Sequence, residues 1–167
     1  MGLPDAERTI EALAERMRGA VAFDARFVGI YSGGAWIAER LAAMIDGDHP
    51  VGYIDVSFYR DDYATAGLKG GTKRSEIPFD VAGARIVLID DVLYTGRSVR
   101  AAVNELFDFG RPAAIELAVL IDRGGRELPI EPTYAGARIA VARDLTVVLS
   151  RGADGRLALG VEPVAGT

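Results

Sequence analysis

Residues 86–98 read IVLIDDVLYTGRS, and this stretch decides the fold class. Its apolar first half predicts a buried strand, which ends at the paired carboxylates Asp90 and Asp91. The next turn contains Thr95 and Gly96, and a helical pattern begins directly after it. A strand, a glycine-containing turn and a helix in this order are typical of α/β proteins, in which ligands bind at the carboxyl ends of the strands.

The rest of the chain alternates in the same way. Helical patterns cover residues 3–18, 35–45 and 97–108, and apolar runs predict strands over 26–31, 51–58, 85–89 and 114–121. From residue 139 onward we expect short strands, with a hairpin at Asp154-Gly155. The pattern predicts a single α/β domain, residues 1–167, with a mainly parallel, twisted sheet flanked by helices.

The amino-acid composition excludes several kinds of catalytic and metal site. The 167 residues contain no cysteine, which excludes a disulfide scaffold, a thiolate nucleophile and cysteine-based zinc sites. The single histidine, His49, lies in the turn-like sequence GDHP and argues against a Ser-His-Asp triad. Any reaction must therefore use carboxylates, hydroxyls, arginines and backbone amides.

Charge and hydropathy indicate where the protein acts. The chain carries 19 Lys and Arg against 24 Asp and Glu, a net charge of -5, which argues against general nucleic-acid binding. No apolar run reaches the roughly 18 residues of a membrane span, and residues 1–8 lack the apolar region of a signal peptide. We expect a cytoplasmic protein without membrane contact.

The turn after Asp91 has the properties of a phosphate site. A helix start directs backbone N–H groups toward one point, where the helix dipole also favours an anion, and Thr95 and Ser98 add hydroxyls. Asp90 and Asp91 lie one short loop away, within reach of the vicinal hydroxyls of a ribose. Paired aspartates alone would more often mark a solvated turn, but the full strand–turn–helix block argues against that alternative.

This block resembles the phosphoribosyl pyrophosphate (PRPP) signature of the type I phosphoribosyltransferases. Further blocks are SFYRDD at 57–62, GRP at 110–112 and DRGGRELPI at 122–130. Together with DDVLYTGR at 90–97, and in this order, they resemble the bifunctional pyrimidine operon regulator/uracil phosphoribosyltransferase family over nearly the whole chain.

The resemblance implies a type I phosphoribosyltransferase fold and conversion of uracil and PRPP to UMP and pyrophosphate with Mg²⁺. It assigns catalytic roles to Asp90 and Asp91, and it leaves the metal mainly to the pyrophosphate of PRPP, with no assigned protein ligand. The residues implied to bind the 5′-phosphate are Val92, Leu93, Tyr94, Thr95, Gly96, Arg97 and Ser98.

Ser32, Gly33 and Gly34 match the family's pyrophosphate loop by position. The alternative is an ordinary turn between a strand and a helix. RNA-binding members place Thr-Arg-Gly here, so Gly33 stands where they have an arginine. Neutralisation of the pyrophosphate is then left to magnesium and to other basic residues.

Those basic residues are expected in a flexible lid at about residues 59–78, where the hydrophobic pattern lapses. The lid candidates are Arg60, Lys69, Lys73 and Arg74, and the two lysines are the only ones in the chain. The alternative for each of them is a solvated surface loop.

Uracil or nucleotide contacts are expected from Ile121, Asp122, Arg123 and Val147, by resemblance. Arg123 has a structural alternative, an ion pair with Asp122 or Glu127. Val147 has the alternative of simple strand core.

Three functions therefore remain open. The leading one is a uracil phosphoribosyltransferase, with a possible additional role in regulating pyrimidine genes. The second is an RNA-binding attenuator that senses UMP or UTP and has little enzymatic activity; the net charge and Gly33 disfavour it. The third is a phosphoribosyltransferase for a different base. A homo-oligomer, dimer or larger, is expected because small members of the superfamily commonly self-associate.

Overall fold

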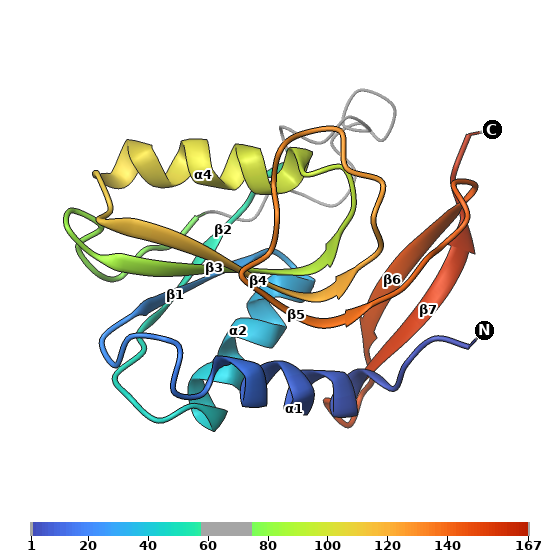
Figure 1. Ribbon diagram of the computed structural model, residues 1–167, viewed down its shortest axis with the longest axis horizontal. Coiled ribbons are helices and arrows are strands. Elements are labelled where there is room, and N and C mark those ends of the chain that lie inside the picture. Colours follow the sequence, from blue (N-terminus) through green and yellow to red (C-terminus); the bar gives the residue numbers. More distant parts are fainter. Residues whose placement is uncertain (1, 58–74, 167) are drawn as a thin grey trace.

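The computed structural model describes residues 2–57 and 75–166. Its centre is a sheet with strand order β2-β1-β3-β4-β5, in which every neighbouring pair is parallel (Figure 1). The strands are β1 (Arg26–Ile30), β2 (Val51–Ile54), β3 (Arg85–Leu93), β4 (Ala114–Asp122) and β5 (Tyr134–Arg138). The predicted α/β fold with a mainly parallel sheet is confirmed.

Helices cover both faces of this sheet. The helices α1 (Ala6–Met17) and α2 (Gly33–Met44) lie on one face, and α4 (Arg97–Phe109) lies on the other (Figure 1). Alternate residues of β3 face opposite sides: Val87 and Ile89 belong to the core under α1 and α2, whereas Ile86 and Leu88 belong to the core under α4. β3 is therefore buried on both sides, and its carboxyl end is held rigidly.

The last two strands form a separate antiparallel hairpin, β6 (Leu145–Arg151) and β7 (Leu157–Pro163). Its turn contains Asp154 and Gly155, and Gly155 has a φ of +83°, a conformation that favours glycine. The hairpin predicted at Asp154-Gly155 is confirmed.

The helix starts differ from the predicted ones. α1 begins after Asp5, whose carboxylate accepts a hydrogen bond from the Arg8 N–H at 2.9 Å, so residues 3–5 precede the helix instead of forming its start. α2 begins at Gly33, not at residue 35. Gly33 and Gly34 are therefore the first helical residues, two residues ahead of the predicted helix start.

β3 is longer than predicted. Its pairing with β4 continues through Val92 opposite Ile121 and Leu93 opposite Asp122, whereas the apolar pattern placed its end at residue 89. Pairing in a parallel ladder does not depend on side-chain polarity, so the polar residues stay in the strand. Asp90 and Asp91 consequently belong to β3 itself and do not follow it.

Two other strands were predicted incorrectly. β2 ends at Ile54, before the predicted end at residue 58, because the Asp55 carboxylate accepts the Ser57 N–H at 2.9 Å and closes a turn. β5 was missed, because its sequence YAGAR has little β-propensity. A Cβ on Gly136 would lie 2.7 Å from the Leu120 carbonyl oxygen, so only glycine fits at the centre of this strand.

The expected lid lies mostly outside the described residues. At its described end, Glu76 exchanges backbone hydrogen bonds with Tyr53 of β2, at 2.7 and 2.8 Å. Glu76 is therefore joined to β2 through its backbone, and the lid stays a prediction. Within the described residues, no helix is long and apolar enough to cross a membrane.

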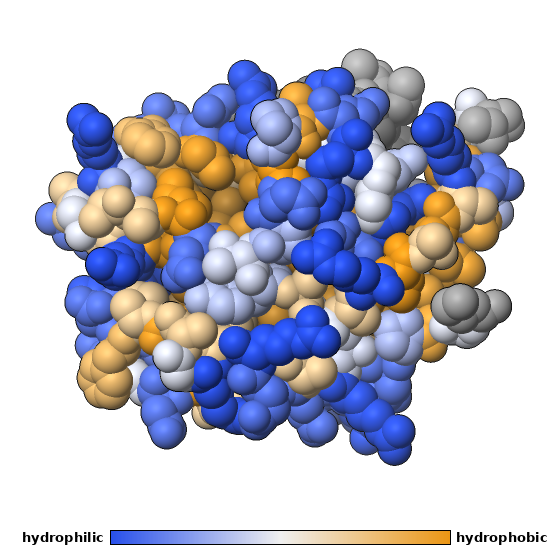
Figure 2. Space-filling model, in the orientation of Figure 1, coloured by the Kyte–Doolittle hydropathy of each residue, from blue (hydrophilic) through white to orange (hydrophobic). Residues whose placement is uncertain are grey.

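One apolar area lies away from the carboxyl ends of the strands. Phe107 and Phe109, in the last turn of α4, are exposed, and Figure 2 shows apolar residues gathered over that end of the helix. Nothing in the described residues shows what covers this area, so the expected homo-oligomer stays a prediction.

Candidate active site

A pocket of about 160 Å³ lies at the carboxyl end of β3. Its lining residues are Asp90, Val92, Leu93, Tyr94, Thr95, Gly96, Arg97, Ser98 and Val99. The structure thus brings together all seven residues expected around the 5′-phosphate and one of the two expected catalytic aspartates. That they bind PRPP stays a prediction.

The turn that forms this pocket depends on Gly96. Gly96 precedes α4 with a φ of +94°, in the left-handed region that glycine tolerates best. The Thr95 hydroxyl accepts the Arg97 N–H at 3.2 Å and so helps to satisfy the first turn of the helix. The start of α4 is thereby directed toward the pocket, where its dipole favours an anion.

The two carboxylates are each held by the next backbone amide. Oδ1 of Asp90 accepts the Asp91 N–H at 2.9 Å, and Oδ1 of Asp91 accepts the Val92 N–H at 2.8 Å. Asp90 is buried, with 4% of its surface exposed, and Asp91 is half-buried. Of the two, Asp90 lines the pocket, where its carboxylate can accept a hydrogen bond from a ligand hydroxyl.

The expected pyrophosphate loop lies against the Asp91 carboxylate. Ser32 precedes α2, and the peptide bond between Tyr31 and Ser32 is cis. A Cβ built on Gly33 would lie only 2.4 Å from Oδ2 of Asp91, so the loop and the carboxylate are in direct contact. The β1–α2 turn, predicted from sequence to share a ligand with β3, is adjacent to it in space.

The segment 122–130 is hydrogen-bonded to the turn between β3 and α4. The carbonyl oxygens of Leu93, Tyr94 and Thr95 accept hydrogen bonds from residues 123–128 at 3.0 to 3.2 Å. These bonds direct the carbonyl oxygens toward that segment. The two segments consequently form one hydrogen-bonded unit.

Asp122 anchors this unit. It is 3% exposed and accepts hydrogen bonds from the guanidinium groups of Arg126, at 2.8 Å, and Arg138, at 2.5 Å, and from the Gly124 N–H, at 3.0 Å. Burial acts to raise the pKa of Asp122, but the hydrogen bonds from Arg126 and Gly124 and the two arginine charges outweigh it and lower the pKa. Asp122 is therefore a charged structural anchor, and its predicted contact with the base stays untested.

Arg123 is buried in a different arrangement. Its guanidinium donates to the carbonyl oxygens of Leu145, at 2.8 Å, and Ala142, at 3.0 Å, and lies 4.0 Å from the centre of the Tyr94 ring. The alternative of an ion pair with Asp122 or Glu127 is wrong, since these carboxylates contact other arginines. Arg123 thus links Tyr94, in the turn between β3 and α4, to the start of β6.

The remaining predicted residues divide into two groups. Ile121 is fully buried at the end of β4, and Val147 is buried within β6, as a strand-core role requires. The lid candidates, Arg60, Lys69, Lys73 and Arg74, lie outside the described residues.

Sequence reasoning gave no role to Arg126 and Arg138. Arg126 lies four residues after Asp122, a spacing that would have suggested an ion pair only in a helix. Arg138 lies in the strand that was missed, so its contact with Asp122 depends on the pairing of β4 with β5.

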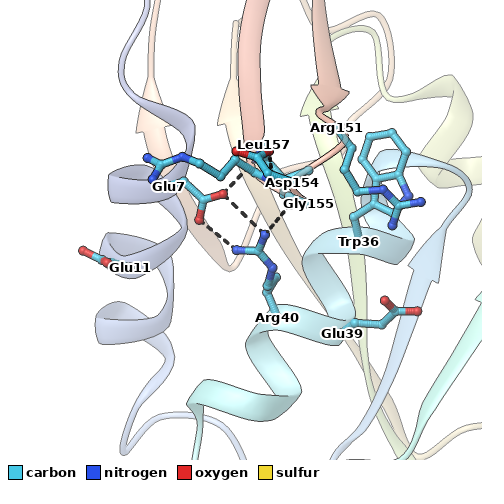
Figure 3. A pocket seen from close by; sticks show the side chains of 10 residues that line it. Glu7, Glu11, Trp36, Glu39, Arg40, Arg151, Asp154, Gly155 and Leu157 are labelled. Atoms are coloured by element: carbon cyan, nitrogen blue, oxygen red, sulfur yellow. Dashed lines mark hydrogen bonds and ion pairs between the residues drawn. The ribbon is translucent and has the colours of Figure 1, made fainter.

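A larger pocket, of about 540 Å³, lies between α1, α2 and the hairpin (Figure 3). Arg40 donates to the Glu7 carboxylate and to the Gly155 carbonyl, both at 2.8 Å, and Glu7 also accepts the Leu157 N–H at 2.8 Å. These contacts fasten the hairpin to the helices. The pocket contains none of the predicted site residues, so the smaller pocket at β3 is the better candidate.

Comparison with known proteins decides the family. Residues 4–140 match the phosphoribosyl transferase domain. The chain belongs to the phosphoribosyltransferases. Its curated relatives include the "Bifunctional protein PyrR" of Ralstonia nicotianae, 52% identical over 157 residues, covering 92% of this chain and 90% of the relative. The protein of that name from Pseudomonas syringae pv. syringae is 43% identical over 169 residues, 99% of this chain and 94% of the relative. The predicted resemblance is confirmed.

Solved structures agree with this phosphoribosyltransferase fold. A hypoxanthine-guanine phosphoribosyltransferase from Bacillus anthracis aligns with a TM-score of 0.64 at 20% identity, over 83% of each chain. A purine phosphoribosyltransferase from Pyrococcus horikoshii aligns with a TM-score of 0.60 at 30% identity, over 80% of this chain and 81% of that one.

Proposed function

We propose that this phosphoribosyltransferase transfers the phosphoribosyl group of PRPP to uracil and releases pyrophosphate. The observation that supports it most is the pocket at the β3–α4 turn, which Asp90 lines. Asp91 follows Asp90 in β3, and a backbone amide holds each carboxylate in place. The similarity to bifunctional PyrR proteins over nearly the whole chain supports a pyrimidine substrate.

In this proposal the phosphate end of PRPP binds at the start of α4, to backbone N–H groups and to the hydroxyls of Thr95 and Ser98. Asp90 and Asp91 accept hydrogen bonds from the ribose hydroxyls. The N1 nitrogen of uracil then forms a bond to the anomeric carbon as the bond to pyrophosphate breaks, and the N1 proton leaves with the pyrophosphate. The oxocarbenium-like transition state requires positioning and electrostatic stabilisation instead of a protein nucleophile.

The donor set fits a magnesium ion bound mainly through the substrate. The described residues hold no cluster of three or more His, Cys, Asp or Glu side chains that would form a protein-only metal site. Asp90 nevertheless provides carboxylate oxygens at the pocket, and Asp91 follows it in β3; carboxylate oxygen is the ligand type that Mg²⁺ prefers when it also binds substrate phosphates. Bound there, the ion would neutralise charge on the pyrophosphate.

The base is proposed to bind beside residues 121–123, with Val147 nearby on β6. Arg123 supports this part of the site because its guanidinium ties Tyr94 to the Leu145 carbonyl. Since the Arg123 guanidinium already donates to carbonyl oxygens, we expect the backbone groups of residues 121–123 to form the hydrogen bonds to the uracil ring.

A purine acceptor is the second candidate, because a purine phosphoribosyltransferase is 30% identical to this chain and shares its fold. The deciding experiment measures pyrophosphate release with PRPP, Mg²⁺ and one base at a time: uracil, hypoxanthine, guanine or orotate. Release with uracil at least about tenfold faster than with the others is expected. Faster release with hypoxanthine or guanine would replace uracil by a purine.

A regulatory role is a separate proposal, which the word "bifunctional" in the relatives' name supports. The net charge of -5 argues against tight RNA binding. Titration of the leader transcript of the protein's own operon, with and without UMP, tests this role. Absence of binding at low salt would exclude it.

A further inference from the structure

Position 33 has no room for a side chain because Asp91 occupies the space. A Cβ built on Gly33 would lie 2.4 Å from Oδ2, 2.8 Å from Cγ and 2.9 Å from Cβ of Asp91. Real Cβ atoms essentially never approach another heavy atom more closely than 3.0 Å. The Asp91 carboxylate is therefore seated directly on Gly33.

The neighbouring glycine is constrained in a different way. A Cβ on Gly34 would lie 2.4 Å from the Ile89 carbonyl oxygen, which belongs to the backbone of β3 and cannot rotate away. Gly34 is thus required for α2 to pack against β3. At Gly33 the opposing group is a side chain, which can turn about its own bonds.

Turning Asp91 away has a definite cost. Its Oδ1 accepts the Val92 N–H at 2.8 Å, and this bond fixes the direction of the carboxylate. A methyl group at position 33 would displace Oδ2 and Cγ, and rotation of the side chain would break the bond to Val92. The short contact to the Asp91 Cβ would also require a small shift of the loop.

We propose that Gly33 is a positioning residue, which sets the direction of the Asp91 carboxylate and thereby the affinity for the ribose of PRPP. This inference rests on the proposed function, in which Asp91 binds the ribose hydroxyls. This role differs from contact with the pyrophosphate, because Gly33, in α2, acts through Asp91 of β3.

Two ligands separate these roles. Ribose 5-phosphate has the hydroxyls and the phosphate of PRPP but no pyrophosphate, whereas magnesium pyrophosphate has no ribose. If Gly33 acts through Asp91, a side chain at position 33 weakens ribose 5-phosphate binding. If Gly33 acts only as part of the pyrophosphate loop, the same change weakens magnesium pyrophosphate instead.

The experiment is titration calorimetry of both ligands with the parent, Gly33→Ala, Asp91→Asn and the double variant. For Gly33→Ala we expect about tenfold weaker ribose 5-phosphate binding, as expected for one charge-assisted hydrogen bond, and pyrophosphate affinity within about twofold of the parent. The double variant should bind ribose 5-phosphate as Asp91→Asn does, since both changes act through one carboxylate.

The control is Gly160→Ala on β7, where a Cβ meets nothing within 4 Å; it should match the parent in both affinities and in thermal midpoint. The proposal is overturned if Gly33→Ala weakens only pyrophosphate, if its effect adds to that of Asp91→Asn, or if it fails to fold. A parent protein that binds neither PRPP nor ribose 5-phosphate would instead contradict the proposed function.

Discussion

Two turns from a strand into a helix lie side by side at the carboxyl end of the parallel sheet, and they use glycine for different reasons. In the β3–α4 turn, Gly96 supplies a φ of +94° and leaves an open pocket in front of the helix. In the β1–α2 turn, Gly33 and Gly34 have ordinary dihedral angles but lie too close to β3 for any side chain. The β3–α4 turn thus depends on its own backbone conformation, whereas the β1–α2 turn depends on close contact with β3.

The two turns are also held by different forces. Residues 123–128 hold the β3–α4 turn through hydrogen bonds to its carbonyl oxygens. Close backbone packing holds the β1–α2 turn, since a Cβ on Gly29 would lie 2.6 Å from the Ala35 Cα. We therefore expect the β3–α4 turn to be sensitive to substitutions that change charge, and the β1–α2 turn to be sensitive to substitutions that change side-chain volume.

The largest expected effect on activity is at Asp90, which lies next to the β3–α4 turn. Asp90→Asn keeps the shape of the side chain but removes the charge beside the ribose. We expect kcat/KM to fall by about a hundredfold or more, which corresponds to roughly 3 kcal/mol of transition-state stabilisation. Steady-state kinetics checks this, with the thermal midpoint as control for folding. An unchanged rate would remove Asp90 from the proposed mechanism.

Asp122→Asn tests whether the charge of Asp122 stabilises the segment that is hydrogen-bonded to the β3–α4 turn. The variant leaves Arg126 and Arg138 without their buried carboxylate, so we expect a loss of about 2 kcal/mol in the free energy of unfolding. Denaturant unfolding measures this loss.

The parent and Asp122→Asn also give a pH test. The pKa of Asp122 is lowered in the folded state, so the charged carboxylate stabilises the fold at pH values above its unfolded pKa of about 4. This stabilisation is lost as the pH falls through the folded pKa. We expect the stability difference between parent and Asp122→Asn to be constant from about pH 7 to pH 5 and to shrink below about pH 4. A difference that does not change over the whole range would contradict this assignment.

Gly96→Ala tests whether the β3–α4 turn depends on the positive φ of Gly96. An alanine at positive φ costs about 1–2 kcal/mol, and its Cβ would also lie 3.3 Å from the Ile130 Cβ. Gly155→Ala, with a φ of +83° and no atom within 4 Å of the new Cβ, is the matched control. Both variants should lose similar stability in denaturant unfolding, but only Gly96→Ala should raise the KM for PRPP.

The smallest effect is expected far from both turns, at the ion pair that fastens the hairpin. The hydrogen bond from Arg40 is the main reason that the pKa of Glu7 is lowered, but both side chains are partly exposed. Glu7→Gln should lower the free energy of unfolding by only about 0.5 kcal/mol, less at high salt. Unchanged kcat and KM are expected, and a change in either would link the hairpin to the active site.

The sequence by itself determined the α/β class, the hairpin at Asp154-Gly155 and the strand–turn–helix block of residues 86–98. These features depend on neighbours within a few residues: the apolar pattern of a strand, a glycine in a turn and the start of a helix. For the same reason, the seven residues expected around a phosphate could be grouped before their geometry was known.

Only the tertiary structure decided which segments meet. The ladder with β4 carries β3 past Asp90 and Asp91, and pairing of β4 with β5 brings Arg138 to Asp122. Packing of α2 against β3 seats Asp91 on Gly33, 58 positions apart in numbering. Hydrophobic periodicity carries no information about such contacts, because they depend on how close two backbones approach after the whole sheet has formed.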